Sequence, residues 1–220
     1  MLDEQLIAEA KVPGLRPTQQ QRSRALVVRL MNEGLALLEE HDFDGLSVEA
    51  LCARCGTTVG SFYARFESKD AFVDTLQRLV VEDRRRELAA RYGSDRIPRD
   101  DLVQLLNWIT KGGIIWLKRH HGLVRASLRR AGSDLGSWTP MRELGRIQVE
   151  YALPMIVDLL GGRSTPDLEQ RIRFAFQIMY GTLNNMILID PGPLTLQDAA
   201  TPRLLATAMH RLIEPDSGHP

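Results

Sequence analysis

The stretch from residue 47 to residue 70 reads SVEALCARCGTTVGSFYARFESKD, and it contains the starts of three successive helices. Ser47, Thr58 and Ser68 are residue types that cap helix N-termini, because a side-chain oxygen can accept a hydrogen bond from a backbone N–H of the first turn. Gly56 is a natural helix end. The stretch therefore predicts helices over 47–54, 58–66 and 68–92, joined by tight turns.

Apolar residues recur at helical spacing along the rest of the chain, and no segment alternates as a strand would. A helix is predicted over 18–40, before the quoted stretch. After a break at Gly93–Pro98, further helices are predicted over 100–119, 121–131, 139–160, 166–189 and 199–213. The expected fold is all-α, with an N-terminal three-helix unit followed by a larger C-terminal helical domain.

The charge of the chain is balanced overall but uneven locally. Its 220 residues carry 28 basic and 28 acidic side chains, for a formal net charge of zero. The segment from Lys11 to Arg29 nevertheless holds five basic residues and no acidic one. A protein that binds nucleic acid must be basic somewhere, so Arg22 and Arg24 in this segment are candidate phosphate contacts.

Composition also points to a cellular compartment. The first ten residues include three acidic ones, which does not fit a secretory signal, and no charge-free stretch reaches the roughly 20 apolar residues that span a bilayer. The two cysteines offer no disulfide framework, as is usual in a reducing environment. We expect a cytoplasmic protein with no membrane contact.

The predicted helix over 58–66 has the features of a DNA recognition helix. Phe62 and Phe66 are four residues apart and should face inward, whereas Val59, Gly60, Ser61 and Tyr63 occupy the opening turns, where small residues permit close approach to a major groove. We expect Thr58, Tyr63 and Lys69 to contact phosphates and Val59 to contact a thymine methyl. The alternative is an ordinary half-buried aromatic at Tyr63 and a solvated side chain at Lys69.

The stretch from Ser47 to Asp70 resembles the N-terminal domain of TetR-family regulators, most closely at Phe62-Tyr63, Phe66 and Ser68-Lys69-Asp70. The resemblance covers about residues 18–72. It implies a homodimer that binds a near-palindromic operator in double-stranded DNA, with a C-terminal domain that dimerises and holds a small-molecule effector. Most such proteins are repressors. The resemblance also implies DNA contacts at Ser47, Thr58, Gly60, Ser61, Tyr63 and Lys69.

On this basis we expect four segments. They are a flexible N-terminal arm over 1–17, a helix-turn-helix DNA-binding domain over 18–67, a helical effector-binding and dimerisation domain over 68–213, and a disordered tail over 214–220. An effector that changed the spacing of the two recognition helices, about 34 to 36 Å in a bound dimer, would release the operator.

The predicted C-terminal domain offers material for a dimer interface and for an effector pocket. Apolar residues of the last two predicted helices are candidates for a four-helix dimer interface: Ile172, Phe176, Met179, Leu183 and Ile187 on one, and Leu204, Leu205, Ala208 and Leu212 on the other. Trp116, Tyr151 and Tyr180 are candidate effector-lining residues. Plain core packing is the alternative for each of these aromatic residues.

Two other functions remain open at this point. Cys52 and Cys55 form a C-x-x-C pair that could make a regulator redox- or metal-responsive, although small buried hydrophobic residues are the simpler interpretation. The chain could also be an all-α ligand-binding protein that does not bind DNA. No nucleophile motif and no glycine-rich phosphate loop is present, so we expect no enzyme, no catalytic residue, no cofactor and no metal.

Overall fold

The structure is a computed structural model that describes residues 2–9 and 21–214. Every regular element within these residues is a helix, which confirms the all-α prediction. Among the same residues, no helix is both long enough and apolar enough to cross a membrane. Contacts divide the chain into two compact units, which are described separately below.

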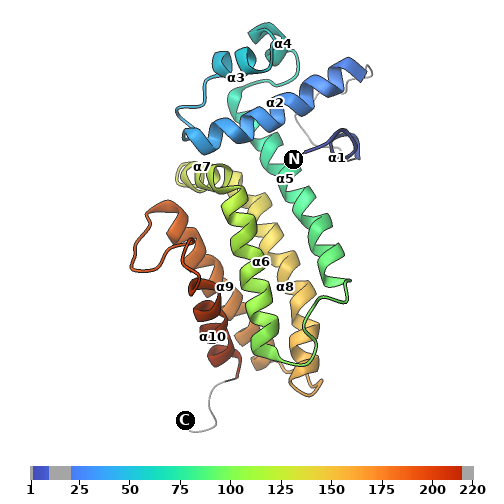
Figure 1. The fold of residues 1–220 in the computed structure, drawn as a ribbon, viewed down its shortest axis with the longest axis vertical. Coiled ribbons are helices and arrows are strands. Elements are labelled where there is room, and N and C mark those ends of the chain that lie inside the picture. The colour runs from blue at the N-terminus through green and yellow to red at the C-terminus, as the bar shows by residue number, and fades with distance from the viewer. Residues whose placement is uncertain (1, 10–20, 215–220) are drawn as a thin grey trace. The chain divides into compact units, whose positions relative to one another are not determined.

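The first unit comprises Met1–Glu87 and His120–Arg142. Its helices are α1 (Glu4–Glu9), α2 (Gln21–Glu40), α3 (Val48–Arg54), α4 (Val59–Tyr63), the first part of α5 (Lys69–Tyr92), α7 (His121–Ala131) and the short 3-10 helix η1 (Leu135–Trp138). Figure 1 shows α3 and α4 beside α2, with the start of α5 following α4. Phe62, Phe66 and Phe72 form an aromatic core there, with ring centroids 5.1–5.4 Å apart.

A glycine inside α2 is explained by this core. Gly34 lowers helix propensity by about 1 kcal/mol relative to alanine. A Cβ at this position would lie 2.5 Å from Cζ of Phe72, so the glycine leaves room for the ring. The aromatic core thus reaches α2 directly.

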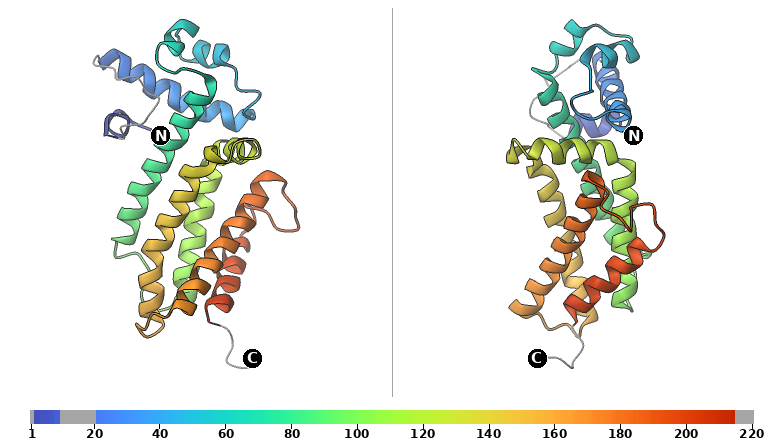
Figure 2. Two further views of the ribbon diagram at one scale, coloured as in Figure 1. Left: turned by 180° about the vertical axis from the view of Figure 1, so that it is seen from behind. Right: turned by 90° about the vertical axis from the view of Figure 1, so that its left-hand side faces the viewer.

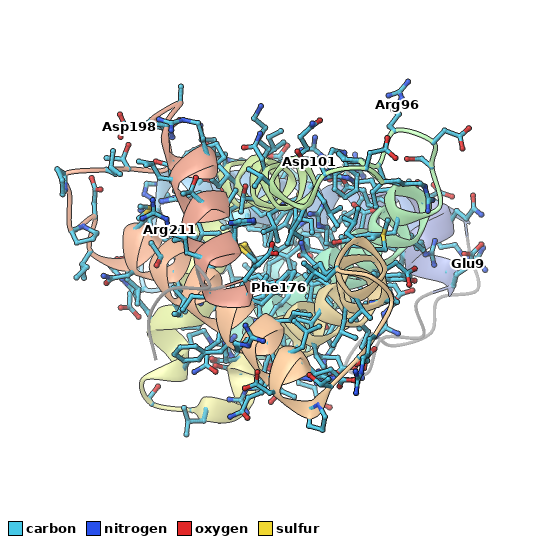
Figure 3. All side chains as sticks on the ribbon, turned by 90° about the horizontal axis from the view of Figure 1, so that it is seen from below. Glu9, Arg96, Asp101, Phe176, Asp198 and Arg211 are labelled. Atoms are coloured by element: carbon cyan, nitrogen blue, oxygen red, sulfur yellow. The ribbon has the colours of Figure 1, made fainter. Side chains whose placement is uncertain are left out.

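The second unit comprises Leu88–Arg119 and Glu143–Pro220. It contains the end of α5, α6 (Leu102–Arg119), most of α8 (Thr139–Leu159), α9 (Pro166–Leu188) and α10 (Thr201–Ile213). These helices run side by side as a bundle (Figure 2). In the end-on view Phe176 lies among the helices, whereas Asp198 and Arg211 lie at the periphery (Figure 3).

The predicted helices from 100–119 to 199–213 agree with α6 to α10 within two residues at each end. Two short elements, α1 and η1, were not predicted, because short helices have little periodicity of their own and depend on tertiary packing. α1 packs on α2, and Asn32 exchanges hydrogen bonds of 3.0 Å with the backbone N–H and carbonyl of Leu2.

Two expected boundaries are therefore corrected. Residues 2–9 are not a flexible arm, since Leu2, Leu6 and Ile7 are buried; the rest of the expected arm, 10–17, lies outside the described residues. The chain also does not divide at residue 67. The first part of α5 carries Phe72 into the core of the first unit, and α7 packs on α2, so both belong with the helix-turn-helix. Of the predicted tail, only Glu214 lies within the described residues.

Candidate nucleic-acid interface

The helix α3 begins at a side-chain cap, as predicted. Ser47 Oγ accepts a hydrogen bond from the backbone N–H of Ala50 at 3.2 Å and donates one to Glu49 Oε2 at 2.8 Å. The pKa of Glu49 is lowered, first by the N–H of its own backbone and then by this hydroxyl. The Ser47 hydroxyl therefore fixes the start of α3 and holds a carboxylate beside it.

The turn between α3 and α4 depends on a left-handed residue. Gly56 has φ of +60°, a conformation in which a side chain would be strained. Thr57 N–H returns to the carbonyl of Cys52 at 3.0 Å, which closes the turn. Gly56 thus sets the angle at which α4 leaves α3.

The helix α4 presents two different faces. Its inner face buries Phe62 completely, as expected, and the following turn buries Phe66. On the outer side Gly60 is exposed and the side chain of Tyr63 is 46% exposed. α4 ends at Tyr63 and continues as a turn to Phe66, so it is shorter than the predicted helix over 58–66.

The start of α4 is capped by Thr58. Its Oγ1 accepts a hydrogen bond from the N–H of Ser61 at 3.1 Å and donates one to Ser61 Oγ at 3.1 Å. Thr58 is exposed, while Val59 and Ser61 are half-buried. The capped helix start therefore lies at the surface with a hydroxyl pair beside it, an arrangement that suits an anion.

The other expected contacts are only partly described. Arg24 lies exposed on α2, and Lys69 is half-buried at the first position of α5. Lys69 Nζ donates to the carbonyl of Phe43 at 3.1 Å, so the ammonium is held rather than freely solvated. The side chain of Arg22 lies outside the described part of the chain.

The helix-turn-helix is acidic. From Leu30 to Leu76 the sequence has nine acidic and three basic residues, which gives a formal charge of −6. One of the three cations, Arg54, pairs with Glu40 at 2.8 Å, and this contact lowers the pKa of Glu40. Any attraction of this region for phosphate would therefore depend on Lys69, which has no ion pair among the described residues, and on the basic segment over 11–29.

The arginines of α7 neutralise part of this acidity. Arg129 Nη1 lies 2.7 Å from Asp42, and Arg130 pairs with Asp74 at 2.8 Å and with Asp70 at 3.3 Å. The sequence could not show this, because α7 is distant in the chain from these acids. A count of charge along the helix-turn-helix gives the only sequence signal, an excess of acid that calls for partners elsewhere.

The two cysteines are packed inside the helix-turn-helix. Burial raises the pKa of both thiols, and that of Cys55 rises to about 11. Nucleophilic attack and metal binding both require the thiolate, which this environment disfavours. Within residues 2–9 and 21–214, no cluster of three metal-binding side chains is present. The buried-hydrophobe interpretation of this pair therefore has physical support.

The three candidate effector-lining residues lie on three different helices of the second unit. Tyr180 donates to Gln148 Oε1 at 2.9 Å, Tyr151 stacks on Tyr92 with ring centroids 5.3 Å apart, and Trp116 is buried in α6. A cavity of about 210 Å³ is present in this unit. Its lining residues are Arg99, Met155, Asp158 and Leu159, and none of the three candidates is among them.

The expected dimer surface is corrected on α9. All five candidates on this helix are buried within the protomer, because they face α10 and the rest of the bundle: Ile172, Phe176, Met179, Leu183 and Ile187. The exposed stripe of α9 includes Phe174, Gly181 and Leu188 instead. On α10, Leu204 and Ala208 are exposed as expected, Leu212 is half-buried and Leu205 is buried.

Comparison with known proteins agrees with the geometry of the first unit. The sequence model for bacterial regulatory proteins of the tetR family matches residues 30–76. Over 61 residues the chain is 31% identical to the HTH-type transcriptional regulator UidR of Escherichia coli (strain K12), a match that covers 28% of this chain and 30% of that protein. The match to curated relatives thus spans less than a third of their length.

Two solved structures share the fold over most of the chain. A tetR-family transcriptional regulator from Streptomyces coelicolor superposes with a TM-score of 0.61 at 15% identity, covering 84% of this chain and 80% of that one. Salmonella enterica GusR superposes with a TM-score of 0.63 at 12% identity, covering 89% and 99%. Residues 30–76 thus form a domain similar to that of bacterial regulatory proteins of the tetR family.

Proposed function

We propose that the chain is a transcriptional repressor that binds a near-palindromic operator in double-stranded DNA as a homodimer and is released by a small-molecule effector. The observation that carries this proposal is the two-faced helix α4. Its inner side is fixed by buried phenylalanines, while its outer side presents Gly60 and Tyr63 to the surroundings. A short helix anchored in this way is suited to the major groove.

The surface positions of Thr58, Gly60 and Tyr63 support the proposed DNA contacts. The exposed start of α4 at Thr58 suits a phosphate, and the ring and hydroxyl of Tyr63 reach beyond the helix. Gly60 and Ser61 would permit close approach to the groove, and Val59 would contact a base. Ser47 marks the start of α3, whose N-terminus would contact the DNA backbone as a second helix end. Arg22 and Arg24 add positive charge to α2.

A binding assay with the full chain tests the DNA proposal. Fluorescence anisotropy with labelled duplexes from the region flanking its own gene should give specific binding whose affinity falls with salt. Tyr63→Ala should weaken that binding by tenfold or more, in line with about 1–3 kcal/mol for a lost anchor at an interface. Ile115→Ala, which truncates an exposed apolar residue of α6, is the matched control and should bind as wild type.

The opposite result has a definite meaning. If wild-type protein shows no specific, salt-dependent binding to any of these duplexes, the repressor proposal fails. A ligand-binding protein without DNA binding would then be the better interpretation.

The exposed stripe of α9 supports the homodimer part of the proposal. Phe174 is 50% exposed, and the stripe that continues through Gly181 and Leu188 is free of charge. α10 packs against α9 and adds exposed Leu204 and Ala208. Two such helix pairs from two protomers would form a four-helix interface. A second copy would remove this apolar surface from water.

The effector part of the proposal rests on the aromatic residues of the second unit. Trp116, Tyr151 and Tyr180 lie on three different helices of this unit, α6, α8 and α9. An apolar ligand that entered between these helices would contact the aromatic rings, and the hydrogen-bonded pair Tyr180–Gln148 would offer it polar groups. A thermal-shift screen should identify compounds that stabilise the fold. A true effector must then also release the operator in the anisotropy assay, and the Tyr180→Phe variant should respond less strongly.

A further inference from the structure

The turn between α2 and α3 holds the ammonium group of Lys69 in place. Lys69 Nζ donates to the carbonyl oxygen of Phe43 at 3.1 Å and lies 4.5 Å from the centroid of the Phe43 ring. Both contacts are attractive for a cation, because a carbonyl oxygen and an aromatic face are each electron-rich. One residue of the turn therefore fixes the position of a side chain that begins α5.

Neither contact neutralises the charge. An ammonium that is paired with a carboxylate has little net charge left for a third group, whereas an ammonium on a neutral carbonyl and ring remains a full cation. No carboxylate of the described residues forms an ion pair with Lys69. The group has three donors, of which the carbonyl uses one, so two N–H bonds remain for an external anion.

Arg130 of α7 forms ion pairs with two acids near the start of α5. Asp70 follows Lys69 directly in sequence, and its carboxylate lies 3.3 Å from Nη2 of Arg130. The second nitrogen of the same guanidinium pairs with Asp74 at 2.8 Å, and the Arg130 side chain is only 12% exposed. Its Cζ also lies 5.0 Å from the centroid of the Phe43 ring. Arg130 thus contacts the ring that positions Lys69 and pairs with the acid that follows Lys69 in the sequence.

We propose that Phe43 and Arg130 are positioning residues that present Lys69 as an un-neutralised cation to a DNA phosphate. This inference rests on the DNA-binding function proposed above. It also offers a reason why an acidic helix-turn-helix keeps a cation at the start of α5: Phe43 holds Lys69 through neutral contacts, and Arg130 pairs with Asp70 and Asp74.

The salt dependence of operator binding tests the proposal, since each phosphate contact contributes a slope of about −0.9 in log K against log salt. Lys69→Gln should make the slope shallower by about 0.9, so that its loss of affinity relative to wild type grows about 3.5-fold when salt falls from 200 to 50 mM. Phe43→Leu should reproduce most of this change, and the double variant should be no worse than Lys69→Gln alone. Phe43→Tyr, which keeps the ring, should restore the wild-type slope.

A second pair of variants tests the role of the arginine and does not depend on the Phe43 variants being folded. Arg130→Gln frees the Asp70 carboxylate and should make the slope shallower, and adding Asp70→Asn should restore it. Lost packing alone would not be rescued by removing a neighbouring negative charge.

The outcomes separate the two proposals. If wild type does not bind specifically, the proposed function fails. If wild type binds but the effects of Phe43→Leu and Lys69→Gln on the slope are additive, or Asp70→Asn gives no rescue, the positioning inference is overturned while the DNA-binding function stands.

Discussion

Substitution of Gly122 by alanine should destabilise the protein, although helix propensity alone predicts the reverse. Gly122 is the second residue of α7, and alanine is favoured over glycine in a helix by up to about 1 kcal/mol. A Cβ on Gly122 would lie 2.1 Å from the carbonyl oxygen of Leu38, 2.3 Å from its carbonyl carbon and 2.6 Å from the nitrogen of Glu39. All three atoms belong to the backbone of α2, so no side-chain rotation relieves the clash.

The size of the effect follows from what must move. α7 would have to retreat from α2 by about 1.3 Å before the closest contact reached 3.4 Å, the lower limit of ordinary van der Waals contact. This would stretch the hydrogen bond from Gly122 N–H to Glu39 Oε1, now 2.7 Å. Overpacking costs about 1–3 kcal/mol and the hydrogen bond about 1 kcal/mol more, against which alanine recovers at most about 1 kcal/mol. The expected net loss is about 1–3 kcal/mol.

Urea unfolding followed by circular dichroism measures this change, with all proteins at one protomer concentration because the proposed dimer makes stability concentration-dependent. Gly113→Ala is the matched control. It lies inside α6, and a Cβ there would meet nothing within 4 Å, so this variant should gain about 0.5–1 kcal/mol. A Gly122→Ala protein as stable as wild type, beside a stabilised Gly113→Ala protein, would refute the close packing of α7 on α2.

Three further predictions concern thiols, assembly and acid. Because the pKa of Cys55 is raised to about 11, only about 0.03% of this thiol is ionised near pH 7.5. The folded protein should therefore react with iodoacetamide far more slowly than the protein unfolded in urea. Equal rates would support a sensor role for Cys52 and Cys55. Phe174→Glu, on the exposed stripe of α9, should shift the proposed dimer towards monomer in analytical ultracentrifugation, whereas Ile115→Glu on α6 should not. A dimer unaffected by Phe174→Glu would exclude the stripe of α9 from the interface. The pKa of the Asp42 carboxyl lies below its usual 3.8, mainly because Gly45 N–H donates a hydrogen bond to it. The stabilising contribution of Asp42 is therefore present above pH 3.8 and is lost as pH falls through the folded-state pKa. Asp42→Asn should narrow the difference in urea midpoint between about pH 5 and pH 3, and an unchanged difference would contradict this linkage.

The local chemistry of the helix-turn-helix could be predicted well. Ser47 and Thr58 act as the caps that their side chains suggested, Gly56 adopts the left-handed conformation that favours glycine, and the spacing of Phe62 and Phe66 placed both rings in the core. These features depend on residues within a few positions of one another. Steric limits on the backbone and a periodicity of 3.6 residues are sufficient to predict them.

The face that a helix turns inward was harder to predict. In α9 the apolar positions from Ile172 to Ile187 mark a broad stripe, but an apolar stripe has the same pattern whether it covers its own core or a partner's. The fold decides between the two, and it buries that stripe and leaves Phe174 and Leu188 outside. Similarly, Trp116, Tyr151 and Tyr180 are aromatic residues on separate helices whose neighbours only the packing defines.

By itself the sequence determined the all-α class, the positions of most helices and the side-chain cap of α4, because each of these results from short-range interactions. Only the tertiary structure decided that α7 belongs with the helix-turn-helix and that its arginines pair with Asp42, Asp70 and Asp74. It likewise showed that Lys69 is held by Phe43 rather than freely solvated. These contacts join residues about 25 to 90 positions apart in the chain, and no local pattern specifies which distant charges meet.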